Sequence, residues 1–327
     1  MGFRIFISGI NHNLYKMKPR ILYIDHAYHI KTCSTKFLID KLKKIAYVDQ
    51  AWIDPSLRGK DIEGLSKFSD NLYYFLILFQ ISLPKYILDH YIDYRHGVFI
   101  PMYDGLVNWS DEDYANISEF QSINFSSTLH EIFVAKGLQS IYCQYFPKPV
   151  NGSQAGDLKS IFFWQRINSV NLDVLLKVLG NQIEKIHYHC SVCSVDPENS
   201  PDVDIGIALK RNIEVSITNW FEKKEDLNKI ISQSSLYFAP RLTEGIGMSF
   251  LEAMAIGRCV IAPNLPTMNE YIKHGETGFL YEPDYLDRVD IDGDDVRYIQ
   301  KNAKNMITEG YDRFINSFDK ILKNIFN

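Results

Sequence analysis

The sequence is poor in cysteine and in long apolar runs, and it carries no excess of positive charge. Its five cysteines, an odd and sparse set in 327 residues, argue against a disulfide framework and favour a reducing compartment. The longest apolar run, Leu72 to Leu83, is shorter than the ~20 residues that a membrane-spanning helix needs. A net charge of −5 argues against nucleic acid as a partner, because phosphate backbones select basic faces.

Metal ligands at metal-binding spacings are also scarce. Cys190 and Cys193 have the spacing of half a zinc site, but no second pair accompanies them. Two Asp-x-Asp triplets, Asp202 to Asp204 and Asp290 to Asp292, lie in polar, turn-like segments late in the chain. The sequence therefore predicts no metal and no cofactor.

The start of the chain shows no secretory signal, because it lacks a long apolar stretch followed by a small-residue cleavage site. The segment Met17 to Asp25 resembles a natural chain start, so we interpret residues 1–16 as an extension. We expect a cytoplasmic protein.

Short apolar runs alternate with helical stretches along the chain, as in parallel α/β layers. A chain of 327 residues is expected to form two domains, since single cores stop growing at ~250–300 residues. Pro147 to Asp157 is rich in proline, glycine and polar residues, which is typical of a linker. The strands expected before it are 3–8, 20–25, 47–53, 73–79, 97–102, 123–127 and 141–146. Those expected after it are 160–166, 185–191, 213–218, 234–240, 259–264 and 278–281.

The most informative segment is residues 243–257, TEGIGMSFLEAMAIG, which holds two glutamates, Glu244 and Glu252, with seven residues between them. An apolar strand ending in Pro240 precedes the segment, and Gly257 is a typical helix C-terminal residue. A strand, a Gly-x-Gly loop and a helix N-terminus form an anion site, because free N–H groups and the helix dipole face the ligand. Because their carboxylates would repel phosphate, we expect Glu244 and Glu252 to bind hydroxyl groups instead. A ligand with both a diphosphate and many hydroxyls is a nucleotide sugar.

This segment and the later Thr267 to Asp284 (TMNEYIKHGETGFLYEPD) resemble the donor site of family 4 retaining glycosyltransferases, the glycosyl transferases group 1. The resemblance covers residues 234–284 most strongly, with weaker support from SIFFWQR, Ser160 to Arg166. It implies the GT-B architecture, in which two Rossmann-like domains with parallel sheets face each other across a cleft. The expected divisions are an acceptor-side domain over residues 1–150, a donor domain over 151–300, and a helix over 301–327 that returns to the first domain.

The resemblance also implies roles for individual residues. Glu252 matches the glutamate that accepts hydrogen bonds from the ribose, and Glu244 the one that holds hydroxyls of the transferred sugar. Arg166 matches an arginine beside the leaving diphosphate, where a fixed cation would neutralise developing charge. The backbone N–H groups that would meet the diphosphate and sugar belong to Gly245, Ile246, Gly247, Met248 and Ser249.

The following positions depart from the family pattern or extend it. The lysine usually found a few residues after the arginine is absent, since Asn171 and Leu172 stand there. We interpret Arg241 as its substitute. Trp220, after an expected strand, is placed to border the nucleotide base, with core packing as the alternative.

The sequence indicates the site residues of the first half less clearly. The loop Asp25 to Ser34 lacks the glycines that the family often has after its first strand. Its polar side chains lie where an acceptor or a donor phosphate would approach; they are His26, His29, Lys31, Thr32 and Ser34. The family also places a histidine of this half near the transferred sugar. The candidates on the acceptor or sugar side are His26, Lys31, Thr32, Ser34, His96 and His130.

The expected function is a cytoplasmic, metal-independent, retaining glycosyltransferase. It would transfer a sugar from a UDP- or GDP-linked donor to a hydroxyl of a saccharide or lipid-linked saccharide, in bacterial surface polysaccharide assembly. Peripheral contact with the inner membrane face is compatible with this interpretation. A nucleotide-sugar epimerase, a phosphorylase and a non-catalytic partner subunit of the same fold stay open as alternatives.

Overall fold

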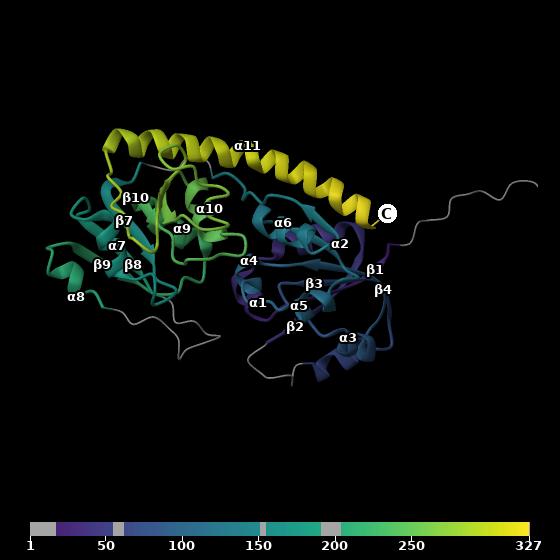
Figure 1. The fold of residues 1–327 in the computed structure, drawn as a ribbon. Coiled ribbons are helices and arrows are strands. Elements are labelled where there is room, and N and C mark those ends of the chain that lie inside the picture. Colours follow the sequence, from purple (N-terminus) through teal and green to yellow (C-terminus); the bar gives the residue numbers. More distant parts are fainter. Residues whose placement is uncertain (1–17, 55–61, 151–154, 191–203, 327) are drawn as a thin grey trace, which may run out of the picture.

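The computed structural model describes residues 18–54, 62–150, 155–190 and 204–326, and they form two parallel sheets joined by one long helix (Figure 1). The expected strand at 3–8, Cys193 and the first Asp-x-Asp triplet up to position 203 lie outside these residues.

The first sheet has the strand order β2-β1-β3-β4-β5-β6, and every pair in it is parallel. Its strands are rich in Ile, Leu, Tyr and Phe and are covered by helices on both faces, as all-parallel sheets must be. The strands are β1 (Arg20–His26), β2 (Tyr47–Ile53), β3 (Leu72–Phe79), β4 (Asp93–Ile100), β5 (Gln121–Asn124) and β6 (Ser140–Tyr142). The helical segments are α1 (Tyr28–Thr32), α2 (Lys36–Ile45), η2 (Glu63–Phe68), α3 (Lys85–Tyr91), α4 (Tyr103–Leu106), α5 (Asp111–Asn116) and α6 (Ser127–Ala135).

The second sheet has the order β12-β11-β10-β7-β8-β9 and is also parallel throughout. Its strands are β7 (Asp157–Trp164), β8 (Lys185–His189), β9 (Glu214–Thr218), β10 (Ser234–Phe238), β11 (Cys259–Pro263) and β12 (Phe279–Tyr281). Its helices are α7 (Leu172–Leu179), α8 (Gly206–Leu209), α9 (Lys224–Gln233) and α10 (Met248–Ala255). The prediction of two Rossmann-like halves is therefore confirmed.

Several expected boundaries differ from the structure; the strand expected at 97–102, for example, is Asp93–Ile100. The strand expected at 123–127 ends at Asn124, because the Ser126 side chain caps α6 by accepting a hydrogen bond from the Leu129 N–H (3.2 Å). The strand expected at 141–146 shortens to β6. The final helix, α11 (Gly293–Phe326), begins before the expected 301, since Asp292 accepts from the Asp294 N–H and acidic residues occupy its first turn.

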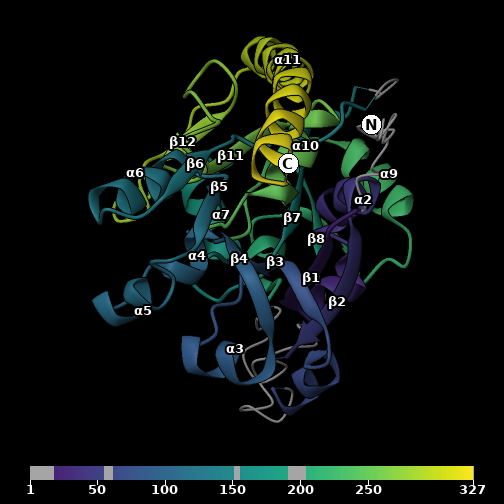
Figure 2. The same cartoon turned by 90° about the vertical axis from the view of Figure 1, so that its right-hand side faces the viewer.

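The helix α11 lies along both halves, as the two perpendicular views agree (Figures 1 and 2). Val296 and Ile299 join the core of the second half. Phe314 and Phe318 pack on Phe37 of the first half, with ring centroids 6.1 Å apart in both pairs. One buried cluster is therefore continuous from the first sheet through α10 and α11.

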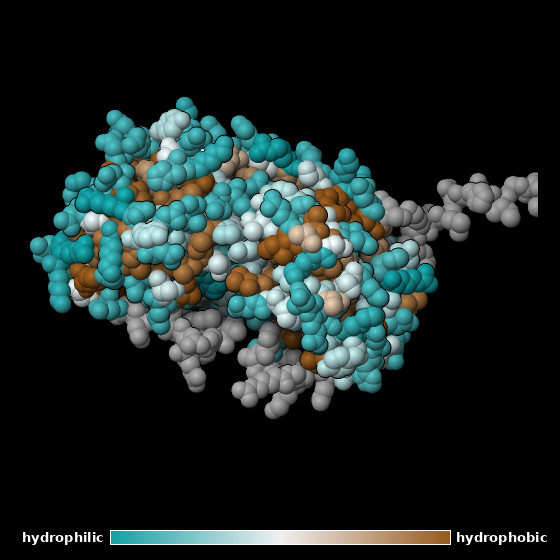
Figure 3. Space-filling view, in the orientation of Figure 1, coloured by the Kyte–Doolittle hydropathy of each residue, from teal (hydrophilic) through white to brown (hydrophobic). Residues whose placement is uncertain are grey.

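On the face shown in Figure 3, hydrophilic and apolar residues are interleaved on both halves. Among the described residues, no helix combines the length and the apolar character needed to cross a bilayer.

Candidate functional site

The two halves touch where the carboxyl ends of their strands face each other, and we call this place the junction. An atom added as Cβ on Gly245, after β10, would lie 2.8 Å from Met102 Cβ, after β4. Arg241 pairs with Asp104 at 3.3 Å, and Lys31 Nζ lies 4.4 Å from the centroid of the Trp220 ring. Ligands of parallel α/β sheets bind outside the carboxyl ends of the strands, so the junction is the candidate site.

The loop after β10 leads into α10 through Gly247, which has a positive φ of 79° and stands at the helix N-cap. A Cβ at Gly247 would lie 2.1 Å from Phe250 Cε1, so only glycine fits. No side chain caps α10, which leaves its first N–H groups directed at the loop. Met248 and Ser249 open the helix, and Gly245 and Ile246 are buried in the loop. This is the geometry of an anion site.

Glu244 occupies the middle of a charged cluster at the junction. Burial raises the pKa of its carboxyl group to about 7, the nearby Asp104 adds to the rise, and Arg241 and Arg166 oppose it. The backbone carbonyl of Glu244 accepts a hydrogen bond from Thr267 Oγ1 (2.7 Å), which fixes the loop. The two arginines and Glu244, expected from the sequence, are thus brought together.

Arg166 follows β7, and its guanidinium lies 4.6 Å from the centroid of the Trp164 ring. The position where the family has a lysine is the N-cap of α7, where Asn171 Oδ1 accepts from the Val174 N–H (3.1 Å). Asn171 therefore has a structural role. Arg241, interpreted from the sequence as the substitute for that lysine, lies at the junction, where it pairs with Asp104.

Glu252 lies one turn into α10 and forms an ion pair with Lys224 at the start of α9. It borders a pocket of about 610 Å³ between α2, α9, α10 and α11. Burial raises the pKa of Tyr237, and the charges of Glu244 and Glu252 add to this rise. Trp220 is half-buried just before α9.

In the first half, the end of β1 and α1 form a hydrogen-bonded cluster around Asp25, which is fully buried. His26 Nδ1 accepts from the Tyr28 N–H (3.0 Å), and Thr32 Oγ1 bonds Ser34 Oγ (3.0 Å). Lys31 reaches the second half through Trp220. The helix α1, which follows β1 directly, lies on the side of the first half that faces the second half (Figure 1).

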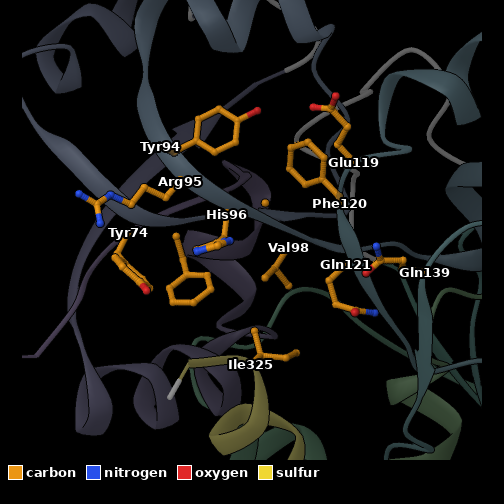
Figure 4. Close-up of a pocket in the computed structure, with 12 residues that line it drawn as sticks. Tyr74, Tyr94, Arg95, His96, Val98, Glu119, Phe120, Gln121, Gln139 and Ile325 are labelled. Carbon is orange, nitrogen blue, oxygen red and sulfur yellow. The ribbon is translucent and has the colours of Figure 1, made fainter.

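The structure does not bring the other two candidate histidines to the junction. His96 is exposed and lines a pocket of about 420 Å³ near the amino ends of the strands, with Ile325 of α11 on its border (Figure 4). His130 faces β6, where its Nδ1 lies 2.7 Å from Ser140 Oγ and its ring stacks on Tyr142.

Two carboxylates that the sequence interpretation did not select join the halves. Burial raises the pKa of Asp104, opposed by Arg241, and its Oδ1 has no hydrogen-bond partner within the described part of the chain. Glu270, between β11 and β12, accepts from Ser126 Oγ (2.6 Å) and from the N–H groups of Ser127 (2.7 Å) and Thr128 (3.2 Å) at the N-terminus of α6. The available signal for Asp104 was its position in the segment that follows β4. Glu270 lies within the Thr267 to Asp284 segment that carries the resemblance, but no role was assigned to it.

No group of three or more His, Cys, Asp or Glu side chains in the described ranges is arranged to hold a metal ion. The triplet at 290–292 precedes α11, where Asp292 accepts from the helix backbone. The junction offers instead N–H groups, two arginines and two glutamates, which suit a diphosphate and hydroxyls.

Comparison with known proteins agrees with this geometry. Residues 159–289, which contain the whole α10 loop, match the family model described as glycosyl transferases group 1. A curated relative from Haemophilus influenzae, described as an uncharacterized glycosyltransferase, is 32% identical over 84 residues. That match spans 25% of this chain and 24% of the relative's length.

Solved structures match nearly the whole chain. Sucrose-phosphate synthase from Thermosynechococcus elongatus gives a TM-score of 0.68 at 14% identity, over 94% of this chain and 99% of that one. HepE of Anabaena, solved in complex with UDP and glucose, gives 0.61 at 13% identity, over 94% and 99% of the two chains. The fold is GT-B, as expected.

Proposed function

We propose that this chain is a glycosyltransferase that transfers a sugar from a nucleoside diphosphate sugar to a hydroxyl of a saccharide acceptor. The observation that carries the proposal is the uncapped N-terminus of α10, reached through Gly247 and bordered by Glu244 between Arg166 and Arg241. The N–H groups and the arginines suit the diphosphate, and the carboxylates suit hydroxyls. Support also comes from the family match over the same residues.

The proposed roles follow from these positions. Arg166 and Arg241 stabilise the charge that grows on the diphosphate as the bond to the sugar breaks. Glu244 holds hydroxyls of the transferred sugar, and Glu252 exchanges Lys224 for the ribose hydroxyls. We further propose that the reaction retains the anomeric configuration and needs no metal, by resemblance to family 4. UDP is our first choice of donor nucleotide, since HepE was solved with UDP.

From the same resemblance, we propose that the acceptor belongs to a bacterial surface polysaccharide or its lipid-linked precursor. The transfer would take place in the cytoplasm, at or near the inner membrane face.

The test is the thermal unfolding of the purified chain with UDP, GDP and ADP, each with EDTA and with MgCl₂. A ligand that binds only the folded chain stabilises it by about 2.7 kcal/mol at a hundredfold excess over Kd. We expect a rise in Tm with UDP or GDP that EDTA leaves intact. The absence of a rise with every nucleotide contradicts the donor site, and a strict need for Mg²⁺ contradicts metal independence.

A matched pair of variants makes the test specific to α10. Glu252→Gln should reduce the rise in Tm, whereas Glu225→Gln, a change of an exposed carboxylate in the first turn of α9, should not. Product analysis with UDP-glucose then separates the alternatives, because an epimerase changes the sugar without releasing UDP and a non-catalytic subunit does neither.

A further inference from the structure

Thr267, in the loop between β11 and β12, has a backbone conformation that is rare for its residue type. Its φ is 76°, in the left-handed region, and only 1% of the residue is exposed. Of the non-glycine residues with positive φ that the structure describes, Thr267 is the only β-branched one. A branched side chain in this region is strained and persists only where its surroundings hold it. The contacts of Thr267 must therefore keep it in this conformation.

The hydroxyl of Thr267 contacts the loop that carries Glu244. Its Oγ1 donates a hydrogen bond to the backbone carbonyl of Glu244 (2.7 Å), where the chain enters the Gly-x-Gly loop before α10. This bond joins two loops of the second half and restricts the backbone from which the Glu244 side chain extends. Thr267 therefore helps to set the position of Glu244.

The backbone of Thr267 faces the contact between the two halves. Its N–H donates to Oε1 of Glu270 (3.4 Å), and the same oxygen accepts from Ser126 Oγ (2.6 Å) at the start of α6. The other oxygen of Glu270 accepts from the Ser127 N–H (2.7 Å). Glu270 is therefore held by the first half, and Thr267 connects it to Glu244.

We infer that Thr267 is a positioning residue, whose hydroxyl holds Glu244 in place for the transferred sugar and links that placement to the contact between the halves. The inference rests on the proposed function, which gives Glu244 its ligand, and adds a residue that acts through Glu244. A glycine would adopt the same φ without strain but would offer no hydroxyl. The hydroxyl thus explains why a strained threonine stands at this position.

The test compares three variants that separate the hydroxyl from the strain. Thr267→Ser keeps the hydroxyl, Thr267→Ala removes it but keeps a Cβ at positive φ, and Thr267→Gly removes both the hydroxyl and the strain. If Thr267 acted only through stability, Thr267→Gly would be milder than Thr267→Ala. The positioning role predicts that both lose the same function, although Thr267→Gly has the higher Tm.

The first measurement follows Glu244 itself and needs no ligand. Carbon-13 NMR of the full chain labelled at glutamate, assigned with Glu244→Gln, reports the pKa of its carboxyl group, which burial raises to about 7. Thr267→Ser should keep this pKa. Thr267→Ala and Thr267→Gly should lower it toward the ordinary 4.5, because a loop that is no longer fixed exposes the carboxyl group to water.

Three results of this titration overturn the inference. The first is a Glu244 that titrates in Thr267→Ala as it does in the parent. The second is a Thr267→Ser that lowers the pKa of Glu244 as much as Thr267→Ala does, because the hydroxyl would then be irrelevant. The third is a parent in which Glu244 titrates like a solvated carboxylate, because Glu244 is then not held.

The second measurement follows the release of UDP from UDP-glucose, UDP-galactose and UDP-N-acetylglucosamine. Thr267→Ala and Thr267→Gly should release UDP about fivefold more slowly than the parent, the loss of about one hydrogen bond, with the affinity for UDP unchanged. Thr267→Ser should stay close to the parent rate. A fall in UDP affinity by the same factor would mean that Thr267 shapes the whole α10 loop, which contradicts a role through Glu244. A parent that neither binds UDP nor cleaves these sugars contradicts the proposed function, whereas the titration of Glu244 still decides the role of Thr267.

A double-variant cycle tests the link to the first half. Glu270→Ala should also lower the pKa of Glu244. Added to Thr267→Ala, it should lower this pKa little further, because both residues act through one hydrogen-bonded chain. Effects that add in full would show that Glu270 and Thr267 act on Glu244 independently, and the link between the halves would then be wrong.

Discussion

Glu244 and Glu252 share one loop and helix but differ in their surroundings. Glu244 lies among Arg166, Arg241 and Asp104, whereas Glu252 pairs with Lys224 beside a pocket. Glu252→Gln should weaken binding of UDP, because the ribose contact exists already in the free nucleotide. Glu244→Gln should leave UDP binding nearly unchanged and lower the turnover of the nucleotide sugar. Calorimetric titration with UDP checks the division of roles, which is wrong if both variants lose affinity equally.

The raised pKa of Glu244 has a consequence for stability. Its carboxyl group titrates at about 7 in the folded chain, compared with an ordinary value of 4.5. Between these pH values the folded chain keeps a proton that the unfolded chain has lost. The free energy of unfolding therefore falls as pH rises through this range.

We expect Glu244→Gln, which cannot ionise, to show a smaller fall in Tm than the parent from about pH 5 to about pH 8. Scanning calorimetry without ligand measures the two slopes. Glu225→Gln on α9 serves as the control and should follow the parent. Parallel slopes for Glu244→Gln and the parent would mean that Glu244 titrates like a solvated carboxylate.

Residue spacing explains why only part of the site was predictable. Glu244, Glu252 and Arg241 lie within one strand, loop and helix, so local rules were enough to bring them together. Asp104 and Glu270 come from segments whose proximity depends on strand order and on how the halves meet. No local pattern encodes that arrangement. The strand pattern itself predicted both sheets, because fully buried parallel strands are continuous apolar runs.

At the scale of elements, the start of α10 depends on the backbone of Gly247. Gly247→Ala combines a left-handed φ of 79° with a Cβ 2.1 Å from Phe250. Gly275 is a matched control, since it has a φ of 76° but open space around its missing Cβ. Gly275→Ala should cost about 1–2 kcal/mol, the strain alone.

Gly247→Ala should cost more than this control and should also abolish the rise in Tm with UDP, because Phe250 must shift and the helix N-terminus moves with it. Urea unfolding of both variants gives the comparison. Equal losses of stability would show that contact with Phe250 contributes nothing.

The same scale accounts for a boundary that the sequence did not predict. Ser126 both caps α6 and donates to Glu270, so the chain leaves β5 earlier than its apolar pattern suggests. A capping serine within an apolar run is hard to recognise when its second partner is distant in sequence.

At the scale of the whole molecule, Glu270 fastens the second half to the N-terminus of α6. Glu270→Ala removes a carboxylate from three donors of the first half, and the positive end of α6 loses its partner. We expect a lower Tm and a larger radius of gyration by small-angle X-ray scattering. Glu276→Ala is the control, because Glu276 lies in the same loop but is exposed and forms an ion pair with Lys273, its neighbour in the chain, and not with the first half as far as the structure describes it. An unchanged radius with a lowered Tm would show that Glu270 stabilises α6 without holding the halves together.

The course of α11 has a further consequence during synthesis. Phe37 and Phe125 belong to the first half, but Phe314 and Phe318 cover them, and Phe326 packs on Phe75 with centroids 4.5 Å apart. On the ribosome the first half therefore emerges with an uncovered aromatic surface, and it stays uncovered until the whole second half has been made. Exposed apolar surface of this kind attracts chaperones and promotes aggregation. A nascent chain stalled just before residue 314 should bind a holdase that releases the chain once α11 is complete.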